Sequence, residues 1–543
     1  MIVLQGTGIV DAVAVGKLRF FDQNRGRIKK VPVQDTELEI QRYQQALSLA
    51  VGQMDHLYQQ ALQELGKENA MIFQAHKMML IDVSYSEYVM GVIREQKVNA
   101  EYAVECAANY YSQILDEIPT PYMRERAADV RDISQRLQEI LTGRTVQRFT
   151  TREPCVLAAA DLLPSQTVQL DRSKILALVT QEGADYSHTA ILARDMGIPA
   201  VIGTKELHPH FDGALAVVDG TEGRVYLDPD PQTLHALTEK MHRLQENRRH
   251  LEEMRGQPNR TRDGTGIEIY ANIASPMDVQ SVLRNDAGGI GLMRSEFLFL
   301  KSTTGYPTEE QQLAAYRYVV EQMGGRPVII RTMDIGADKQ VDYFELLHEE
   351  NPAMGFRGIR ICLERRELFL TQLRAILRAS AYGPAALLYP MIISEEEIRQ
   401  IRQLVQEAGR QLDAQNIPYD HNIRQGIMVE TPAAALLSDR LARHVDFFGI
   451  GTNDLTQYTL AVDRQNPKVT RYYDPHHEAV LRLVEMTVKN AHAAGISVGI
   501  CGELAGDLSL TRRFLEMGVD ELSVSPAHIL ELRRQVRSLD LKK

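Results

Sequence analysis

Tryptophan is absent from the chain, and cysteine is scarce. The four cysteines are Cys106, Cys155, Cys362 and Cys501, and no two of them form a CxxC pair. Disulfide frameworks and structural zinc sites need clustered cysteines, so we expect neither, and a reducing cytoplasm fits best. The N-terminal residues lack a basic stretch followed by a long apolar core, so we expect no secretory signal.

Long hydrophobic runs and an excess of positive charge are also lacking. The longest run without a polar residue, counting Gly and Pro as apolar, extends from Ala381 to Ile393. It is shorter than the about 20 residues of a membrane helix, so we expect no membrane insertion. Lys and Arg number 61 against 72 Asp and Glu, a formal net charge of -11. This balance argues against a partner that is a nucleic acid.

The rest of the composition is that of a globular protein, with 24% charged and 44% hydrophobic residues in 543. At about 150 residues per domain, the length suggests three or four domains. Residues 1–33 contain short apolar runs that predict strands. From Gln34 to Ile118 proline is absent, and apolar residues recur at the spacing of amphipathic helices. We predict an all-α bundle over 34–143, with helices near 43–61, 69–80, 99–116 and 122–141.

Strand patterns return after the bundle. They lie at 155–162, 175–180 and 200–203, with a helix from about Ser187 and a hairpin over 215–227. The N-terminal strands could complete the sheet of this unit. We therefore predict one α/β domain from residues 1–33 plus 144–230, with the helical bundle inserted. We predict that residues 231–262 form a charged linker helix.

The final segment, 263–543, alternates strands and helices. Eight strands are predicted, at 267–273, 288–293, 327–333, 387–392, 426–430, 447–452, 497–501 and 521–525. Eight β/α units in about 280 residues are typical of a (β/α)8 TIM barrel. A doubly wound open sheet is the alternative.

Polar side chains stand where the predicted barrel strands end, which is where the chemistry of TIM barrels occurs. They are Arg294 after the second strand; Arg331, Asp334 and Lys339 at the third; Glu430 after the fifth; Asn453, Asp454 and Arg464 after the sixth; and Cys501 and Glu503 after the seventh. Arginine matches phosphate oxygens bidentately. Carboxylates such as Glu430 and Asp454 suit Mg²⁺.

The combination predicts a site for a phosphorylated carboxylic acid held on a metal ion. Each residue also has an ordinary structural interpretation. The arginines could form surface ion pairs, the carboxylates could cap helices, and Cys501 could be a small buried hydrophobe.

His188 marks a second candidate site, in the α/β domain. It follows a glycine turn and starts a helix, where backbone N–H groups attract an anion such as phosphate. Imidazole is a nucleophile near neutral pH and can carry a phosphoryl group. Thr167 is a candidate to orient the ring. The alternative is a polar histidine near a helix cap.

Long stretches of the chain resemble the phosphoenolpyruvate-utilising enzymes, and among them the Enzyme I family of the bacterial sugar phosphotransferase system. The similar stretches are 159–170 and 186–204 in the α/β domain; 289–299, 329–339, 350–360, 372–380, 428–435, 446–464 and 501–507 in the barrel; and 72–80, 99–104 and 122–132 in the bundle. The resemblance implies a phosphohistidine domain, a phosphoenolpyruvate-binding barrel and a helical docking domain for the phosphocarrier protein HPr.

The resemblance also implies a role for each residue. His188 accepts the phosphoryl group, and Cys501 donates a proton to the enolate. Substrate binding falls to Arg294, Arg331, Lys339, Arg357, Asn453 and Arg464, and Mg²⁺ binding to Glu430 and Asp454. The implied reaction is phosphoenolpyruvate–protein phosphotransfer, the first step of sugar uptake through this system, in a cytoplasmic homodimer formed through the barrel.

Three other functions are weighed as alternatives to this one. A dikinase-type enzyme shares both catalytic parts but adds a nucleotide-binding domain, for which no residues remain. A non-catalytic regulatory paralogue would lack residues such as His188 or Cys501, which are present. A barrel lyase or aldolase using Mg²⁺ would leave the phosphohistidine domain unexplained.

Overall fold

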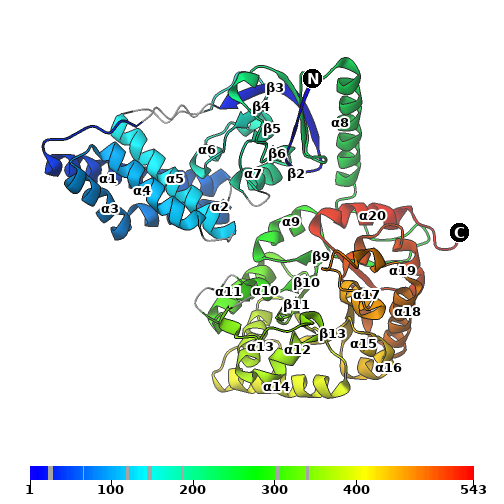
Figure 1. Cartoon of the computed structure of the whole chain (residues 1–543). Helices are drawn as coiled ribbons and strands as arrows, with labels where there is room; N and C mark the ends of the chain where they lie inside the picture. Colours follow the sequence, from blue (N-terminus) through cyan, green and yellow to red (C-terminus); the bar gives the residue numbers. More distant parts are fainter. Residues whose placement is uncertain are drawn as a thin grey trace. The chain divides into compact units, whose positions relative to one another are not determined.

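The computed structural model of the protein describes all residues except 22–27, 65, 118–120, 144–148, 185–186, 301, 303–304 and 338–341. Lys339 and the predicted domain start at residue 144 fall outside the described residues. The chain divides into two compact units, Met1–Arg248 and Arg249–Lys543 (Figure 1). No helix among the described residues combines the length and the apolarity needed to cross a membrane.

Five helices form the bundle of the first unit: α1 (Thr36–Glu64), α2 (Gly66–Leu80), α3 (Val83–Gln96), α4 (Ala100–Asp116) and α5 (Pro121–Thr142). Tyr43, Met54 and Phe73 are among the side chains of its buried core. The sequence predicted only four of these helices and missed α3. Its start is marked by Asp82, whose carboxylate accepts from the backbone N–H groups of Ser84 (2.9 Å) and Tyr85 (3.1 Å). This is an N-cap signal.

The same unit contains an eight-stranded sheet in the order β1-β8-β7-β3-β4-β5-β6-β2. Its strands are β1 (Ile2–Gln5), β2 (Thr7–Ile9), β3 (Val13–Phe21), β4 (Cys155–Ala159), β5 (Ile175–Thr180), β6 (Ala200–Ile202), β7 (Leu215–Asp219) and β8 (Arg224–Leu227). β3 pairs in parallel with β4 and antiparallel with β7. The N-terminal strands therefore complete the sheet, and the prediction of an inserted all-α bundle is confirmed.

Three helices accompany the sheet: α6 (Pro164–Thr167), α7 (His188–Met196) and α8 (Pro231–Glu252). The predicted linker helix is α8. Lys240 on this helix contacts the buried Asp219 at the end of β7, with Nζ 2.6 Å from the carboxylate. Arg248 donates to the carbonyl of Gly197 (2.9 Å). Polar contacts thus hold α8 along the first unit up to its last turn.

The second unit is a closed barrel of eight parallel strands: β9 (Glu268–Ile273), β10 (Ile290–Arg294), β11 (Val328–Arg331), β12 (Ala385–Tyr389), β13 (Arg424–Val429), β14 (Phe447–Ile450), β15 (Ser497–Ile500) and β16 (Glu521–Val524). Each pairs with the next, and β16 returns to β9. All eight predicted strands are present, so the TIM barrel is confirmed and the open sheet is wrong.

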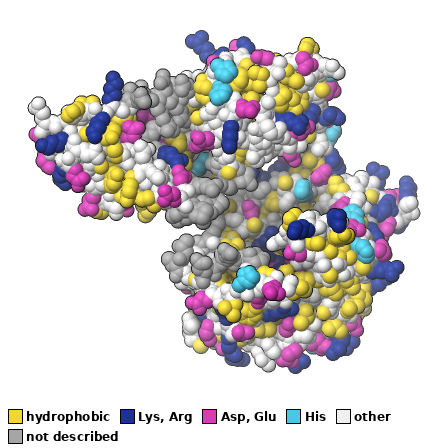
Figure 2. Space-filling view, in the orientation of Figure 1, with side chains coloured by type: hydrophobic (Ala, Val, Ile, Leu, Met, Phe, Trp, Pro, Cys, Tyr) yellow, Lys and Arg dark blue, Asp and Glu magenta, His cyan; other side chains and the backbone are white. Residues whose placement is uncertain are grey.

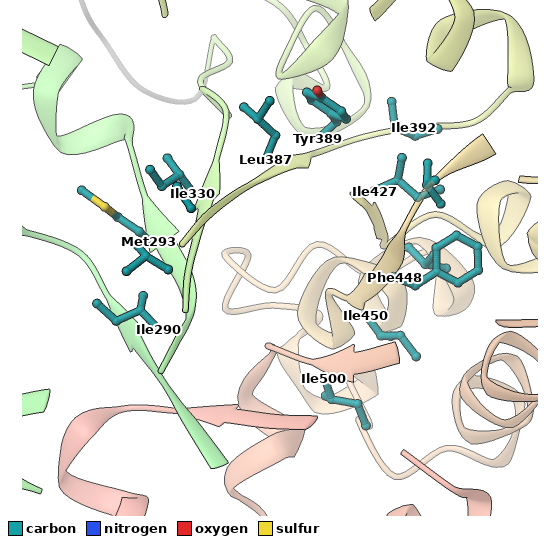
Figure 3. Packing of buried hydrophobic residues seen from close by; sticks show 14 of the residues in the cluster. Ile290, Met293, Ile330, Leu387, Tyr389, Ile392, Ile427, Phe448, Ile450 and Ile500 are labelled. Atoms are coloured by element: carbon teal, nitrogen blue, oxygen red, sulfur yellow. The ribbon is translucent and has the colours of Figure 1, made fainter. Parts of the chain in front are cut away.

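Helices surround the barrel (Figure 1). They are α9 (Val279–Arg284), α10 (Glu296–Leu300), α11 (Glu309–Gln322), α12 (Ile359–Glu364), α13 (Arg366–Ser380), α14 (Glu395–Ala414), α15 (Pro432–Leu436), α16 (Ser438–Leu441), α17 (Thr452–Leu460), α18 (Glu478–Ala493), α19 (Thr511–Met517) and α20 (Ile529–Ser538). The main core includes Ile290, Met293 and Ile330 from neighbouring strands (Figure 3). A smaller cluster, which includes Leu388, Phe447 and Cys501, packs separately.

Candidate active site

His188 is the first residue of α7. Ser187 caps this helix, and its Oγ accepts from the backbone N–H of Ala190 (3.4 Å). The imidazole is half-buried. The first N–H groups of a helix have no intrahelical acceptor, so a group attached to His188 would lie beside donors that favour negative charge.

The charges of buried groups in the helical bundle shift the pKa of this histidine. Burial lowers the pKa of His188, while the carboxylate of Asp129 raises it and His76 lowers it further. His76 on α2 and Asp129 on α5 are themselves joined, with Nε2 3.0 Å from Oδ1. The net lowering of the pKa favours the unprotonated imidazole, which is the nucleophilic form.

The bundle also contacts the short helix that precedes α7. Asp132 on α5 accepts from both the backbone N–H (3.1 Å) and the hydroxyl (2.6 Å) of Ser165 on α6. Thr167, predicted as a candidate to orient the His188 ring, donates its hydroxyl to the carbonyl of Pro164 (2.8 Å). The hydrogen bonds of the described residues include none between Thr167 and that ring.

The other predicted site residues gather at the C-terminal ends of the barrel strands. Arg294 and Arg331 are the last residues of β10 and β11, and Glu430 directly follows β13. Asp454 lies in the first turn of α17, after β14, and Cys501 directly follows β15. Because all eight strands are parallel in a closed barrel, these side chains share one rim.

One carboxylate on this rim holds two arginines, the buried Arg331 and the half-buried Arg357. Arg357 donates to Asp334 from Nε (3.2 Å) and Nη2 (2.8 Å), and Arg331 Nη1 lies 3.2 Å from the same carboxylate. Arg331 also donates to Glu296 (3.1 Å). The guanidinium groups are thereby fixed in orientation before any anion binds, which lowers the entropy lost on binding.

Glu430 and Asp454 form a buried carboxylate pair, exposed by only 1% and 7%. Burial, followed by the charges of Asp454 and Asp334, raises the pKa of Glu430 to about 8. Oδ1 of Asp454 is buried and accepts no hydrogen bond. A divalent cation between the two groups would remove their repulsion and supply the missing partner, so the residues fit a metal of the Mg²⁺ type.

Cys501 presents a thiol to the barrel interior and is 5% exposed. Its Sγ lies 3.6 Å from the carbonyl oxygen of Ile450, to which it donates. Burial is the main cause that raises its pKa to about 12. The group therefore remains a protonated thiol at neutral pH, a state that suits a proton donor better than a thiolate nucleophile.

The remaining predicted ligands are more exposed. Arg464 Nη2 lies 3.8 Å from Asp454. The amide of Asn453 donates to Glu503 (2.9 Å) and accepts from its backbone N–H (2.9 Å). Arg294 is exposed and forms no ion pair with any described residue, so its charge is available to an anion.

Three polar residues organise the rim although none was predicted as a ligand, and only Asp334 was named from the sequence, as a polar residue at the third strand end. Glu296 and Asp334 orient the arginines, and the Tyr458 hydroxyl accepts from Arg357 Nη1 (3.1 Å). Glu296 could have been predicted as a rim residue, because it stands two residues after Arg294 at the same strand end. Tyr458 lies inside a helix far along the chain, and no local pattern indicates it.

Comparison with known protein families matches almost the whole chain to phosphoenolpyruvate-utilising enzymes. Residues 248–541 match their PEP-binding domain, residues 5–126 their N-terminal domain, and residues 151–223 their mobile domain.

Known relatives give the same result over nearly full length. Phosphoenolpyruvate-protein phosphotransferase from Geobacillus stearothermophilus is 40% identical, over 99% of this chain and 93% of that protein. The namesake from Haemophilus influenzae is 40% identical, over 95% and 90%. The namesake from Bacillus subtilis is 37% identical, over 99% and 94%.

Proposed function

The chain belongs to the phosphoenolpyruvate-utilising enzymes, and we propose that it moves the phosphoryl group of phosphoenolpyruvate to His188 and then to a histidine of the phosphocarrier HPr. Pyruvate is the other product. The observation that carries the proposal is the barrel rim, where fixed arginines, a carboxylate pair and a protonated thiol converge. Relatives near 40% identity that carry the name phosphoenolpyruvate-protein phosphotransferase support the same reaction.

The arginines of the rim bind the phosphate of the substrate. Arg331 and Arg357 are held by Asp334, and Arg294 supplies an exposed positive charge. Arg464 and Lys339 complete the pocket in this proposal, and Asn453 contacts the substrate. Preorganised cations stabilise the charge on the transferring oxygens without reorganising during the reaction.

Glu430 and Asp454 would hold Mg²⁺. When bound, the ion neutralises charge on the substrate oxygens. The raised pKa of Glu430 and the buried Asp454 oxygen that accepts no hydrogen bond both support a cation at this position. Among the described residues no group of three or more His, Cys, Asp or Glu could hold a metal. The substrate itself would therefore complete the coordination.

His188 is the nucleophile. The unprotonated ring nitrogen attacks phosphorus, an N–P bond forms, and the P–O bond to the enolate oxygen breaks. The lowered pKa of His188 keeps the ring ready for attack at neutral pH. After transfer, the new negative charge lies at the N-terminus of α7, where the helix dipole stabilises it.

Cys501 completes the formation of pyruvate. Its Sγ–H donates a proton to the methylene carbon of the enolate, which becomes the methyl group of pyruvate. The thiolate left behind is costly in this buried position and recovers a proton from solvent.

The helical bundle is the docking domain for HPr in this proposal. Apolar side chains reach the bundle surface (Figure 2), and Met78, Ile81 and Val83 are 71%, 56% and 68% exposed at the junction of α2 and α3. Exposed apolar side chains that lie close together mark protein interaction sites. The site residues are divided between the two compact units, so the units must meet during each cycle.

The family resemblance supports two further elements of the proposal. The enzyme acts as a homodimer formed through the barrel. It works in the cytoplasm, where reduced cysteines persist, and none of its four cysteines forms a disulfide.

Intact-protein mass spectrometry tests the proposal. With phosphoenolpyruvate and Mg²⁺, the parent chain gains one phosphoryl group and releases pyruvate, and HPr then removes that group. A His188→Ala variant and an EDTA-treated sample serve as controls and show no gain. The proposal fails if the parent gains no mass, or if the His188→Ala variant gains the same mass.

A further inference from the structure

Met391 has a backbone conformation that is unfavourable for its residue type. Its φ is 60°, in the left-handed region, where the Cβ of an L-residue crowds its own backbone. Within the described part of the chain, Met391 is the only buried residue other than glycine with a positive φ, and it is 2% exposed. Such strain persists only where the surrounding structure enforces it, and it is concentrated at functional sites.

The strained residue lies in the turn that follows β12, on the rim that carries the candidate active site. Only Pro390 separates it from the last residue of that strand. Tyr389 and Ile392, on either side of this short turn, are buried in the main core (Figure 3). Thr431 donates from Oγ1 to the carbonyl of Ile392 (3.1 Å). Core packing and this hydrogen bond therefore hold the turn on both sides of Met391.

The turn directs a backbone donor at Glu430. The N–H of Met391 donates to Glu430 Oε1 (2.6 Å), and both residues are buried. This hydrogen bond is charge-assisted when Glu430 is ionised, as it must be to bind a cation. A Cβ on Gly451 would lie 3.0 Å from the other oxygen, Oε2. The carboxylate is thus confined by a donor at one oxygen and by the backbone of Gly451 near the other.

The side chain of Met391 makes a separate set of contacts, on the arginine side of the rim. Its Sδ lies 3.8 Å from the hydroxyl of Tyr458, which accepts from Arg357 Nη1 (3.1 Å). A Cβ on Gly358 would lie 3.2 Å from Met391 Cγ. These contacts use the side chain, whereas the contact with Glu430 uses the backbone, so substitutions can separate the two.

We propose that Met391 is a positioning residue for the metal site: its left-handed turn aims the backbone N–H at Glu430 and holds that carboxylate in the orientation that binds the cation. The strain then has a function, because a turn with negative φ would carry the N–H away from Glu430. A ligand oriented in advance loses less entropy on binding. The assignment rests on the proposed function, since it deepens the role of Glu430 in holding Mg²⁺.

Two substitutions that both remove the side chain separate the backbone from the thioether. Met391→Gly keeps the N–H and adopts positive φ without strain. Met391→Pro has no N–H, and its ring fixes φ at negative values. If Met391 acted only through its side chain, the two variants would behave alike. Met391→Ile adds an independent comparison, because it keeps a buried apolar side chain but is β-branched and therefore disfavoured at positive φ.

The probe is Mn²⁺, and electron paramagnetic resonance of the free ion measures its affinity in the presence of phosphoenolpyruvate. Every protein is the full chain with His188→Ala, so that no phosphoryl transfer to this residue consumes the substrate. Met293→Ile is the matched control for Met391→Ile, because Met293 is equally buried in the main core but has no positive φ (Figure 3). Circular dichroism verifies that each variant folds.

We expect Met391→Pro and Met391→Ile to weaken Mn²⁺ binding by about ten-fold or more, the usual effect of losing a group that orients a metal ligand. Met391→Gly and Met293→Ile should bind nearly as the parent does. If either member of the Gly and Pro pair does not fold, Met391→Ile against Met293→Ile decides the result.

Two results would overturn the assignment and leave the proposed metal site intact: equal affinities of Met391→Gly and Met391→Pro, or equal affinities of Met391→Ile and Met293→Ile. Absence of Mn²⁺ binding by the His188→Ala parent would overturn the metal site of the proposed function together with this assignment. The failure of the inference is therefore distinguishable from the failure of the proposed function.

Discussion

At the scale of single residues, the thiol of Cys501 has the properties of a general acid. Burial is the main cause that raises its pKa to about 12, so the thiol stays protonated at neutral pH. Its position directly after β15 puts it on the rim that carries the arginines and the carboxylate pair. In the proposed mechanism the two partial reactions, phosphoryl transfer and carbon protonation, depend on different side chains, so we expect mutation to separate them.

A Cys501→Ser variant tests this separation. The serine hydroxyl is a much weaker acid, so we expect pyruvate formation to slow by about 100-fold or more, the usual contribution of a positioned general acid. Phosphorylation of His188 in a single turnover should change much less. Rapid-quench assays of pyruvate and of phosphoprotein measure the two steps.

Cys106→Ser is the matched control, because Cys106 lies half-buried in the helical bundle. It should leave both rates unchanged. Equal slowing of the two steps in Cys501→Ser, or no slowing, would contradict the assignment of Cys501 as proton donor.

At the scale of elements, the positions where strands end could be predicted from the sequence. The contacts between side chains across the barrel could not be predicted. Most barrel strands contain a short apolar run, and Arg294, Glu430 and Cys501 stand where such runs stop. Parallel strands in a barrel bring those positions together. Tyr458 reaches Arg357 only through the tertiary fold, so no local pattern could indicate it. Helix α3 was missed although Asp82 marks its start, because the prediction followed apolar spacing and assigned no helix between residues 80 and 99.

Helix α14 begins with a capping box formed by Ser394 and Glu397. Ser394 Oγ accepts from the backbone N–H of Glu397 (3.3 Å), and the Glu397 carboxylate accepts from the backbone N–H of Ser394 (2.9 Å). We expect Ser394→Ala to destabilise the barrel by about 1 kcal/mol. Urea denaturation of the barrel transition measures this change. Ser394→Asp, which retains an acceptor, should cost less, and equal losses would argue against the cap.

At the scale of the whole molecule, separate cores predict separate unfolding. The barrel has its own main core, and the first unit contains three others, one in the bundle and two beside the sheet. Units with independent cores commonly unfold in distinct transitions. A ligand that binds one unit should stabilise only the transition of that unit.

Differential scanning calorimetry of a His188→Ala variant tests this expectation without phosphoryl transfer. Phosphoenolpyruvate with Mg²⁺ should raise one transition by several degrees, since a ligand at 100 times its Kd adds about 2.7 kcal/mol. The other transition should remain in place. One shared transition, or an equal shift of both, would show that the two units unfold together.

Because β3 and β4 are parallel, the helical bundle forms part of the crossover connection between them. Phe21 at the end of β3 lies beside Ala159 at the end of β4, so the chain must return along the whole strand before β4 begins. Parallel neighbours always need such a crossover connection, usually one helix. Here more than a hundred residues serve as that connection. A shortened enzyme without the bundle would therefore still need a crossover of about a dozen residues or more between β3 and β4.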